Sequence, residues 1–199
     1  MTVQIVLATH NAHKVEELRR ILAPQLPGVE VLAYDGPEPV EDGISFTENA
    51  LIKARAAAAH TGLPAIADDS GICVDILGGA PGIFSARWSG PAKDAGENLR
   101  LLLWQLSDVP EEHRDAHFTC VAALALPDGT ERAVTGEWPG QLLFEPAGAN
   151  GFGYDSIFLP EGYAISAAEL SAHVKNQVSH RAIALEGLVP VLREVLGQA

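Results

Sequence analysis

The chain has 199 residues, of which 47% are hydrophobic, and it carries a formal net charge of −13. The hydrophobic content is sufficient for a buried core and argues against a disordered chain, and the length predicts a single domain over residues 1–199, or two lobes that share a core. The acidic balance argues against binding to nucleic acid or to anionic membranes, because both require a basic surface.

The N-terminal part of the chain predicts strands and helices in alternation. The apolar runs 3–8 and 29–33 have the length and composition of buried strands. Residues 11–22 carry apolar side chains at helical spacing, which predicts a helix between the two strands. Residues 35–43 are rich in glycine, proline and acids, and we expect a loop there.

The next predicted helix has a start signal and a stop signal. Ser45 and Glu48 form a capping box at its start, and Gly62 is a typical stop. Within this helix Asn49 and Lys53 are four residues apart, so both lie on one face.

Two adjacent acids, Asp68 and Asp69, lie between predicted strands at 63–67 and 72–77. An apolar run that ends in acids predicts a strand that delivers carboxylates to its C-terminal edge, where open α/β sheets bind ligands. Adjacent carboxylates repel, so we expect one to hold its proton more tightly or both to share a cation. One alternative is a turn in which Gly71 takes a positive φ, and another is the Asp-Ser-Gly motif of dimeric aspartic proteases.

The second half of the chain predicts an antiparallel portion followed by a helix. The sequence Pro127-Asp128-Gly129-Thr130 is a strong hairpin signal between two apolar runs. The expected elements are a helix at 94–106, strands at 118–126, 131–138 and 141–144, and a helix at 179–196. Together with the first half, they predict an α/β fold with a mixed sheet.

Both cysteines lie in apolar, strand-like runs. This placement predicts that Cys73 and Cys120 are buried thiols in a reduced, cytoplasmic protein. No apolar stretch approaches the length of a membrane span, so we expect no membrane association.

A candidate phosphate site follows the first predicted strand. Thr9-His10-Asn11 lies at the start of the predicted helix, and Lys14 lies one turn further. Helix N-terminal amides favour an anion, which Lys14 can reach. The alternative is that Asn11 only caps the helix.

A candidate metal site includes Glu41, which lies in the loop before the helix that carries Lys53. With the Asp pair it can complete an oxygen ligand set for Mg²⁺, which takes one or two carboxylates plus substrate phosphates. The alternative is that Glu41 is an ordinary surface acid.

Candidate contacts to a nucleoside lie towards the C-terminus. The segment Gly151-Phe152-Gly153-Tyr154-Asp155 offers two aromatic faces on which a base can stack. Lys175, His180 and Arg181 precede or open the last helix and can donate to a purine carbonyl. The alternatives are a glycine loop held by two buried rings and ordinary polarity at a helix start.

Taken in this order, six segments resemble the inosine triphosphate pyrophosphatase family, the Ham1-like group, over nearly the whole chain. Each segment alone is weak, but six in order are very specific. They are Ala8-Thr9-His10-Asn11 with Lys14, Phe46-Thr47-Glu48-Asn49-Ala50 with Lys53, Ala67-Asp68-Asp69-Ser70-Gly71, Gly79-Ala80-Pro81-Gly82 with Ser85-Ala86-Arg87, Gly151-Phe152-Gly153-Tyr154-Asp155, and Ser179-His180-Arg181.

The resemblance implies Mg²⁺-dependent hydrolysis of ITP, dITP and XTP to the monophosphate and pyrophosphate by a homodimer, which removes these nucleotides from the pool. It implies an elongated mixed sheet flanked by helices, in two lobes with an active-site cleft between them. The implied metal ligands are Glu41 and Asp69, and Asp69 is also the implied general base. The implied substrate-binding residues are Thr9, His10, Asn11, Ala12, His13, Lys14, Lys53, Ser70, Phe152, Gly153, Tyr154, Asp155, Lys175, His180 and Arg181.

Two positions depart from the family pattern. His10 stands where the family usually has glycine, and Ser156 stands where proline is common. We expect the first change to alter the backbone of the phosphate loop, and we expect Asp68 to raise the pKa of Asp69. The alternatives to this activity are a Maf-like nucleotide pyrophosphatase, an aspartic protease and a nucleotide-binding protein without catalysis.

Overall fold

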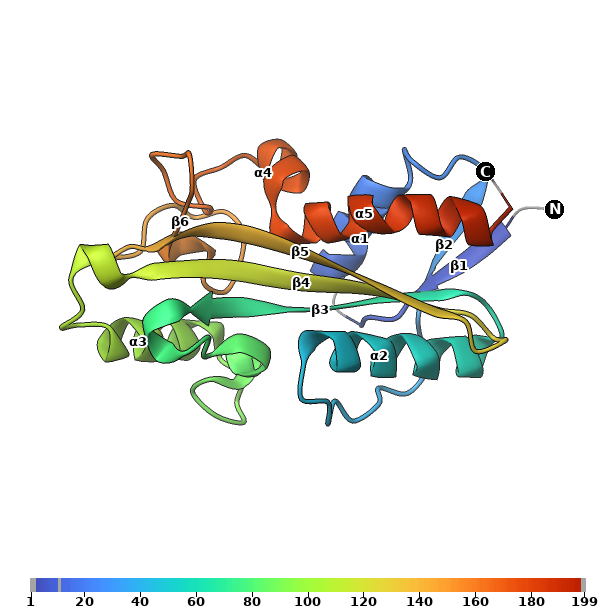
Figure 1. Ribbon diagram of the computed structural model, residues 1–199, viewed down its shortest axis with the longest axis horizontal. Coiled ribbons are helices and arrows are strands. Elements are labelled where there is room, and N and C mark those ends of the chain that lie inside the picture. Colours follow the sequence, from blue (N-terminus) through green and yellow to red (C-terminus); the bar gives the residue numbers. More distant parts are fainter. Residues whose placement is uncertain (1–2, 11, 198–199) are drawn as a thin grey trace. The chain divides into compact units, whose positions relative to one another are not determined.

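The computed structural model describes residues 3–10 and 12–197, and the chain divides into two compact units. Unit 1 is formed by Met1–Asp69, Cys120–Gly136 and His180–Ala199, and unit 2 by Ser70–Thr119 and Glu137–Ser179. The three long strands drawn in Figure 1 each pass from one unit to the other, so each unit is built from segments that are distant in sequence.

The strands form one sheet in the order β2-β1-β3-β4-β5-β6. β1 pairs in parallel with β2 and β3, whereas β5 and β6 are antiparallel, so the sheet is mixed. This arrangement confirms the predicted α/β fold with a mixed sheet flanked by helices. The elements are β1 (Val3–Leu7), α1 (Ala12–Leu22), β2 (Val29–Ala33), α2 (Phe46–Thr61), β3 (Ala65–Val74), α3 (Ala95–Gln105), β4 (Asp115–Ala125), β5 (Glu131–Leu142), β6 (Phe158–Pro160), α4 (Ala172–Val178) and α5 (His180–Val195).

In unit 1, helices cover both faces of the sheet. Successive strand residues point to opposite sides, so an apolar strand presents an apolar surface to the helices on each face. Leu7 and Ile66 belong to a buried cluster with the apolar faces of α1 and α5. Val6 and Ala65, each one position away, belong to a second cluster with α2. A side chain in β3 therefore faces either α1 and α5 or α2, according to its position in this alternation.

α2 has the start and the end that the capping signals predict. The Ser45 hydroxyl accepts a hydrogen bond from Glu48 N at 3.2 Å, and the Glu48 carboxylate accepts one from Ile44 N at 2.7 Å. Gly62 ends the helix in the left-handed region, with a φ of 69°. Small side chains let the helix approach the sheet closely: Ala50, Ala54, Ala57 and Ala58 are buried.

The region around the Asp pair differs from the prediction. The sequence predicted two strands, 63–67 and 72–77, but β3 is one strand that runs from Ala65 to Val74. The acids do not end the strand because each carboxylate finds buried partners on its own face of the sheet, as described below. Gly71 is part of the strand and does not take a positive φ, so the alternative prediction of a turn at Gly71 is wrong.

α5 packs closely on the sheet in unit 1. A Cβ atom at Gly136 of β5 would lie 2.2 Å from the carbonyl oxygen of His180, so glycine permits this contact. α5 also continues through Pro190, which lies inside the helix. None of the helices in the described part of the chain is both long and apolar enough to cross a membrane.

Unit 2 has its own core, in which α3 and β5 pack around Phe158. The structure has no separate strand at the predicted position 141–144, because β5 continues to Leu142. The strand next to β5 in the sheet is β6, and Leu142 of β5 pairs with Phe158 of β6. A three-residue strand carries too little periodicity to be recognised in the sequence. The helix α4 was also missed. The predicted burial of the two cysteines is confirmed, since Cys73 and Cys120 are buried free thiols.

Candidate active site

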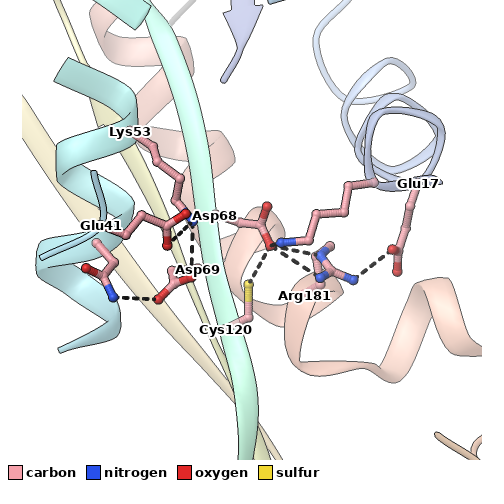
Figure 2. A network of polar contacts seen from close by, with 9 residues as sticks. Glu17, Glu41, Lys53, Asp68, Asp69, Cys120 and Arg181 are labelled. Carbon is pink, nitrogen blue, oxygen red and sulfur yellow. Dashed lines mark hydrogen bonds and ion pairs between the residues drawn. The ribbon is translucent and has the colours of Figure 1, made fainter. Parts of the chain in front are cut away.

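The Asp pair lies just beyond the carboxyl end of the parallel strand β1. The parallel register of β1 with β3 ends at Leu7 and Ile66, and Ala8 N donates to Ile66 O at 2.7 Å. Asp68 and Asp69 follow on β3, and as neighbours in a strand they point to opposite faces, which Figure 2 shows. The carboxylates therefore lie within β3 and not at the end of a strand as predicted, and each contacts a different ammonium group, Lys14 for Asp68 and Lys53 for Asp69.

Asp69 faces α2 and meets Lys53. The Lys53 ammonium lies 3.1 Å from Asp69 Oδ1 and 3.3 Å from Glu41 Oε2, so two carboxylates converge on one cation (Figure 2). Burial raises the pKa of Asp69, and Glu41 adds to this effect, while Lys53 opposes it. Burial and Glu41, rather than Asp68, therefore account for the raised pKa of Asp69.

Lys53 stays protonated in this setting. Burial works to lower the pKa of Lys53, but the negative charges of Asp69, Asp68 and Glu41 outweigh it and raise that pKa. The prediction that Asn49 and Lys53 share a face is confirmed, because both side chains contact Asp69.

Asn49 belongs to the site but was not among the site residues predicted from the sequence. Its Nδ2 donates to Asp69 Oδ2 at 3.3 Å, and its Oδ1 accepts from Gly43 N at 3.0 Å. This buried side chain therefore connects the loop that carries Glu41 to the carboxylate of Asp69. The four-residue spacing between Asn49 and Lys53 was the sequence signal that could have identified it.

Asp68 faces α1 and α5 and meets two other cations. Asp68 Oδ2 accepts hydrogen bonds from Lys14 Nζ at 2.9 Å and from Arg181 Nε and Nη2 at 3.2 and 3.3 Å. Arg181 Nη1 donates to Glu17 Oε2 at 2.7 Å. Burial alone would raise the pKa of Asp68, but Lys14 and Arg181 outweigh it and hold that pKa well below its usual range. Asp68 is therefore a fixed anion.

The thiol of Cys120 lies beside this ion network. Its thiol lies 4.0 Å from Asp68 Oδ2, and burial together with the charge of Asp68 raises the pKa of Cys120 to about 12. The thiol is therefore neutral and unreactive at physiological pH.

The structure tests only part of the predicted phosphate segment. Asn11 lies outside the described residues, as do the side chains of Ala12 and His13. Thr9 follows β1, and its N–H donates to Leu7 O at 2.8 Å. Lys14, in the first turn of α1, is brought to the edge of the sheet that carries the Asp pair.

His10, which replaces the usual glycine, packs against the loop that leads to Glu41. His10 Nδ1 lies 2.8 Å from Glu38 Oε1, and its ring stacks on Tyr34 with centroids 5.5 Å apart. The Tyr34 hydroxyl donates to Pro37 O at 3.0 Å. The phosphate segment and the loop of residues 35–43 are thus joined through His10.

Unit 2 contains a separate cluster of predicted substrate residues. Asp155 Oδ2 accepts from Lys175 Nζ at 2.5 Å and from Phe152 N at 2.8 Å, and Lys175 Nζ lies 5.5 Å from the centre of the Phe152 ring. Phe152 is half exposed, which leaves a ring face open, whereas Tyr154 is buried and donates to Ser85 O. Gly153 takes a positive φ, and Ser70 is half-buried.

The last two candidates open α5 and are both buried. Arg181 was expected to face a purine, but its Nε and both terminal nitrogens bind the carboxylates of Asp68 and Glu17 in this structure. The base-reading role of His180 and Arg181 stays a prediction.

The carboxylates of Glu41 and Asp69 fit a magnesium ion that takes only a few of its ligands from the protein. Glu41 and Asp69 converge on one cation, and two carboxylates are a typical protein contribution to Mg²⁺. Over residues 3–10 and 12–197, no group of three or more His, Cys, Asp and Glu side chains is arranged to hold a metal. Substrate phosphates and water would therefore complete the coordination.

Comparisons with known proteins agree on one family. A model of the Ham1 family matches residues 5–191. The dITP/XTP pyrophosphatase of Leifsonia xyli subsp. xyli is 59% identical over 191 residues and 96% of each chain, and that of Streptomyces avermitilis is 59% identical over 98% of this chain and 99% of its own. The solved structure of a HAM1 protein from Coxiella burnetii is 40% identical, with a TM-score of 0.88 over 96% of this chain and 99% of that one. The chain belongs to the Ham1 family.

Proposed function

We propose that this chain hydrolyses ITP, dITP and XTP to the nucleoside monophosphate and pyrophosphate, and thereby removes these nucleotides from the pool. One observation carries the proposal: relatives named dITP/XTP pyrophosphatase are 59% identical over nearly the full length of both chains. The geometry around Asp69 supports the same chemistry. The continuous strand through Asp69-Ser70-Gly71 and the family membership argue against the aspartic protease alternative.

The chemistry of the proposed reaction is charge neutralisation and orientation of a water molecule. Cleavage of a phosphoanhydride needs little covalent participation from the protein, because most of the barrier is lowered by positioning and electrostatics. Lys14 and Lys53 would neutralise the triphosphate. Both ammonium groups are partly buried, which strengthens their effect on a phosphate charge.

Asp69 is the proposed general base. Its raised pKa favours proton abstraction, because a carboxylate with a pKa closer to the working pH is a better base. Lys53 and Asn49 hold its two oxygens, so the carboxylate has a defined orientation towards a water molecule. Attack on either the α- or the β-phosphorus would release the monophosphate and pyrophosphate.

Glu41 and Asp69 are the proposed holders of Mg²⁺. When bound, the metal would neutralise phosphate charge and polarise the phosphoryl oxygens. The role of the chain is to present the two carboxylates together, and Lys53 and Asn49 do this by contacting Asp69 from α2.

The proposed base contacts are Phe152, through its exposed ring face, and Lys175, through its ammonium group. A donor that faces the 6-oxo group of hypoxanthine or xanthine would meet an amino group in ATP and lose its hydrogen bond. Such a mismatch between a polar site and a ligand that cannot pair with it gives strong discrimination.

The test is pyrophosphate release from ITP, dITP, XTP, ATP and GTP with Mg²⁺, repeated with EDTA. We expect release from the first three nucleotides, little from ATP or GTP, and loss of activity with EDTA. No release from ITP or XTP, or equal release from ATP, would contradict the proposal. Tight binding of ITP without hydrolysis would indicate a nucleotide-binding protein instead.

We also propose that the protein is a cytoplasmic homodimer. The family resemblance supports the dimer, and two buried free thiols are consistent with a reducing compartment. Sedimentation equilibrium across a range of protein concentrations would measure the oligomeric state, and a monomer throughout would contradict the dimer.

A further inference from the structure

The ion network around Asp68 is complete without a ligand. It contains two carboxylates, Asp68 and Glu17, and two cations, Lys14 and Arg181, so its charges balance. The side chains of Asp68 and Arg181 are only 1% and 2% exposed. A balanced, buried network of this kind gives each member one preferred position, because any displacement leaves a buried charge without its partner.

The network is a chain of contacts with a buried centre, Asp68 and Arg181, and two less buried ends, Glu17 and Lys14. Arg181 contacts both Asp68 and Glu17 (Figure 2). Asp68 in turn accepts a hydrogen bond from Lys14. Lys14 is the most exposed of the four side chains, at 18%. Lys14 is therefore the member best placed to reach a ligand. Its ammonium group is held by Asp68, which is held in turn by Arg181.

Among the residues that the structure describes, the side-chain contacts of Asp68 are all made by one of its two oxygens. Oδ2 receives Lys14, both Arg181 nitrogens and the Cys120 thiol. Oδ1 is buried and accepts no hydrogen bond from any residue that the structure describes. Because Lys14 and Arg181 share a single acceptor, the position of the Lys14 ammonium depends directly on the orientation that Arg181 gives to Asp68.

We infer that Asp68 is a positioning residue that holds the Lys14 ammonium for the triphosphate, with Arg181 and Glu17 fixing the orientation of Asp68. The inference rests on the proposed phosphate-binding role of Lys14. It gives Asp68 a function distinct from that of Asp69, which faces the other side of β3 and is held by Lys53 and Asn49. A role as a further Mg²⁺ ligand is disfavoured, because two cations already neutralise this carboxylate.

A double-mutant cycle between Asp68→Asn and Lys14→Met tests this inference. Asparagine keeps the shape of the side chain and removes its charge, and methionine keeps the length of lysine and removes the ammonium. We expect Asp68→Asn to lower kcat/KM for ITP by about 10- to 100-fold, the usual effect of removing a partner that orients a binding group. In the Lys14→Met background the same substitution should cause no further loss.

The measurement separates a positioning role from a structural one. Losses that multiply in the double variant would overturn the inference, because Asp68 would then act independently of Lys14. A changed Mg²⁺ requirement in Asp68→Asn would also overturn it, in favour of a metal ligand. Cys120→Ala is the matched control, since the thiol touches the same oxygen but not Lys14. An equal loss in this control would point to disturbed packing and contradict the inference.

Two further measurements keep the test decisive. If Asp68→Asn does not fold, as judged by its thermal unfolding curve, Glu17→Gln replaces it, because Glu17 is partly exposed and lies at the far end of the network. Its loss should likewise vanish in the Lys14→Met background, and persistence there would overturn the inference. The affinity for inorganic triphosphate, measured by calorimetry in the same variants, tests the coupling without turnover. A failure of the proposed hydrolysis is thereby distinguished from a failure of the positioning role.

Discussion

The two faces of β3 at the Asp pair differ in nearly every physical respect. Asp68 faces α1 and α5, is almost fully buried, and meets two cations, so its pKa is lowered. Asp69 faces α2, is less buried, and shares Lys53 with the carboxylate of Glu41, so its pKa is raised. Identical neighbouring residues thus become a fixed anion and a candidate base. The difference arises from the partners that each face supplies.

The largest expected effect is on the Asp69 face. Asp69→Asn removes the proposed base while keeping the shape of the side chain, and we expect kcat to fall by about 10² to 10⁴-fold, the usual contribution of general base catalysis. ITP affinity should remain, because Lys14 and Lys53 are unchanged. Pyrophosphate release and ITP calorimetry measure the two quantities. Retained turnover would remove Asp69 from the role of base and would make the two faces less different than proposed.

On the Asp68 face the expected effect is on stability. Asp68→Asn leaves Arg181 and Lys14 without their shared carboxylate, and the loss of one partner from a buried ion pair costs about 3–5 kcal/mol in the free energy of unfolding. Urea denaturation at pH 7 measures this change. A cost as small as that of an exposed pair would show that the network is not well formed.

Glu41→Gln tests whether the Asp69 face holds the metal. Removing one of the two carboxylates should raise the Mg²⁺ concentration for half-maximal activity about 10- to 100-fold, in the range found when a metal site loses a supporting group. The measurement is pyrophosphate release across a magnesium titration. Glu48→Gln, in the first turn of α2, is the control, because the Glu48 carboxylate accepts a backbone hydrogen bond from Ile44 N. An unchanged Mg²⁺ requirement in Glu41→Gln would contradict the metal assignment.

The pKa shifts predict opposite pH dependences for the two faces. The lowered pKa of Asp68 stabilises the fold above the ordinary Asp value near 3.9, and this contribution is lost as the pH falls towards the folded-state pKa. The raised pKa of Asp69 costs stability above the ordinary value, and that cost disappears at lower pH. Without Mg²⁺, Asp69→Asn should therefore be more stable than the wild type at pH 7, and Asp68→Asn less stable. Both differences should shrink below about pH 3. Urea denaturation across pH measures them, and equal signs at pH 7 would contradict the comparison.

The smallest expected effect comes from His10. His10→Gly removes an exposed contact with Glu38, and exposed ion pairs contribute about 0–1 kcal/mol, so stability should change little. The loop that carries Glu41 should be held less firmly, which would raise the Mg²⁺ requirement slightly without changing the Asp68 network. Urea denaturation and a magnesium titration measure both quantities. Glu38→Gln should have a similar effect, and a stability loss as large as that of Asp68→Asn would contradict this account.

Much of the fold could be predicted because local signals were strong. The capping residues Ser45 and Gly62 gave the ends of α2 correctly, and β2 has the predicted bounds. The errors lie where tertiary contacts outweigh local pattern. β3 continues through two acids because partners on both faces neutralise them, and β6 has only three residues, too few for a period to be visible.

The candidate site was also predicted only in part, because local signals identify some of its residues and tertiary contacts decide the others. Lys53, Asp69 and Glu41 were expected together, and the structure brings them together around one ammonium. The contacts of Arg181 with Asp68 and with Glu17 were not expected, because Arg181 lies 113 positions from Asp68 and 164 positions from Glu17 in the chain. No spacing rule connects residues at such a distance.

The sequence by itself determined which chemical groups are available and in what order, and its ordered motifs were enough to indicate the Ham1 family. It also indicated that Asp68 and Asp69 follow a buried strand segment, because an apolar run before two acids is a local pattern, but it did not show that the strand continues through them. Only the tertiary structure decided what each acid does. The side-chain alternation of β3 sends them to opposite faces, and helices from distant parts of unit 1 supply a different set of charges to each.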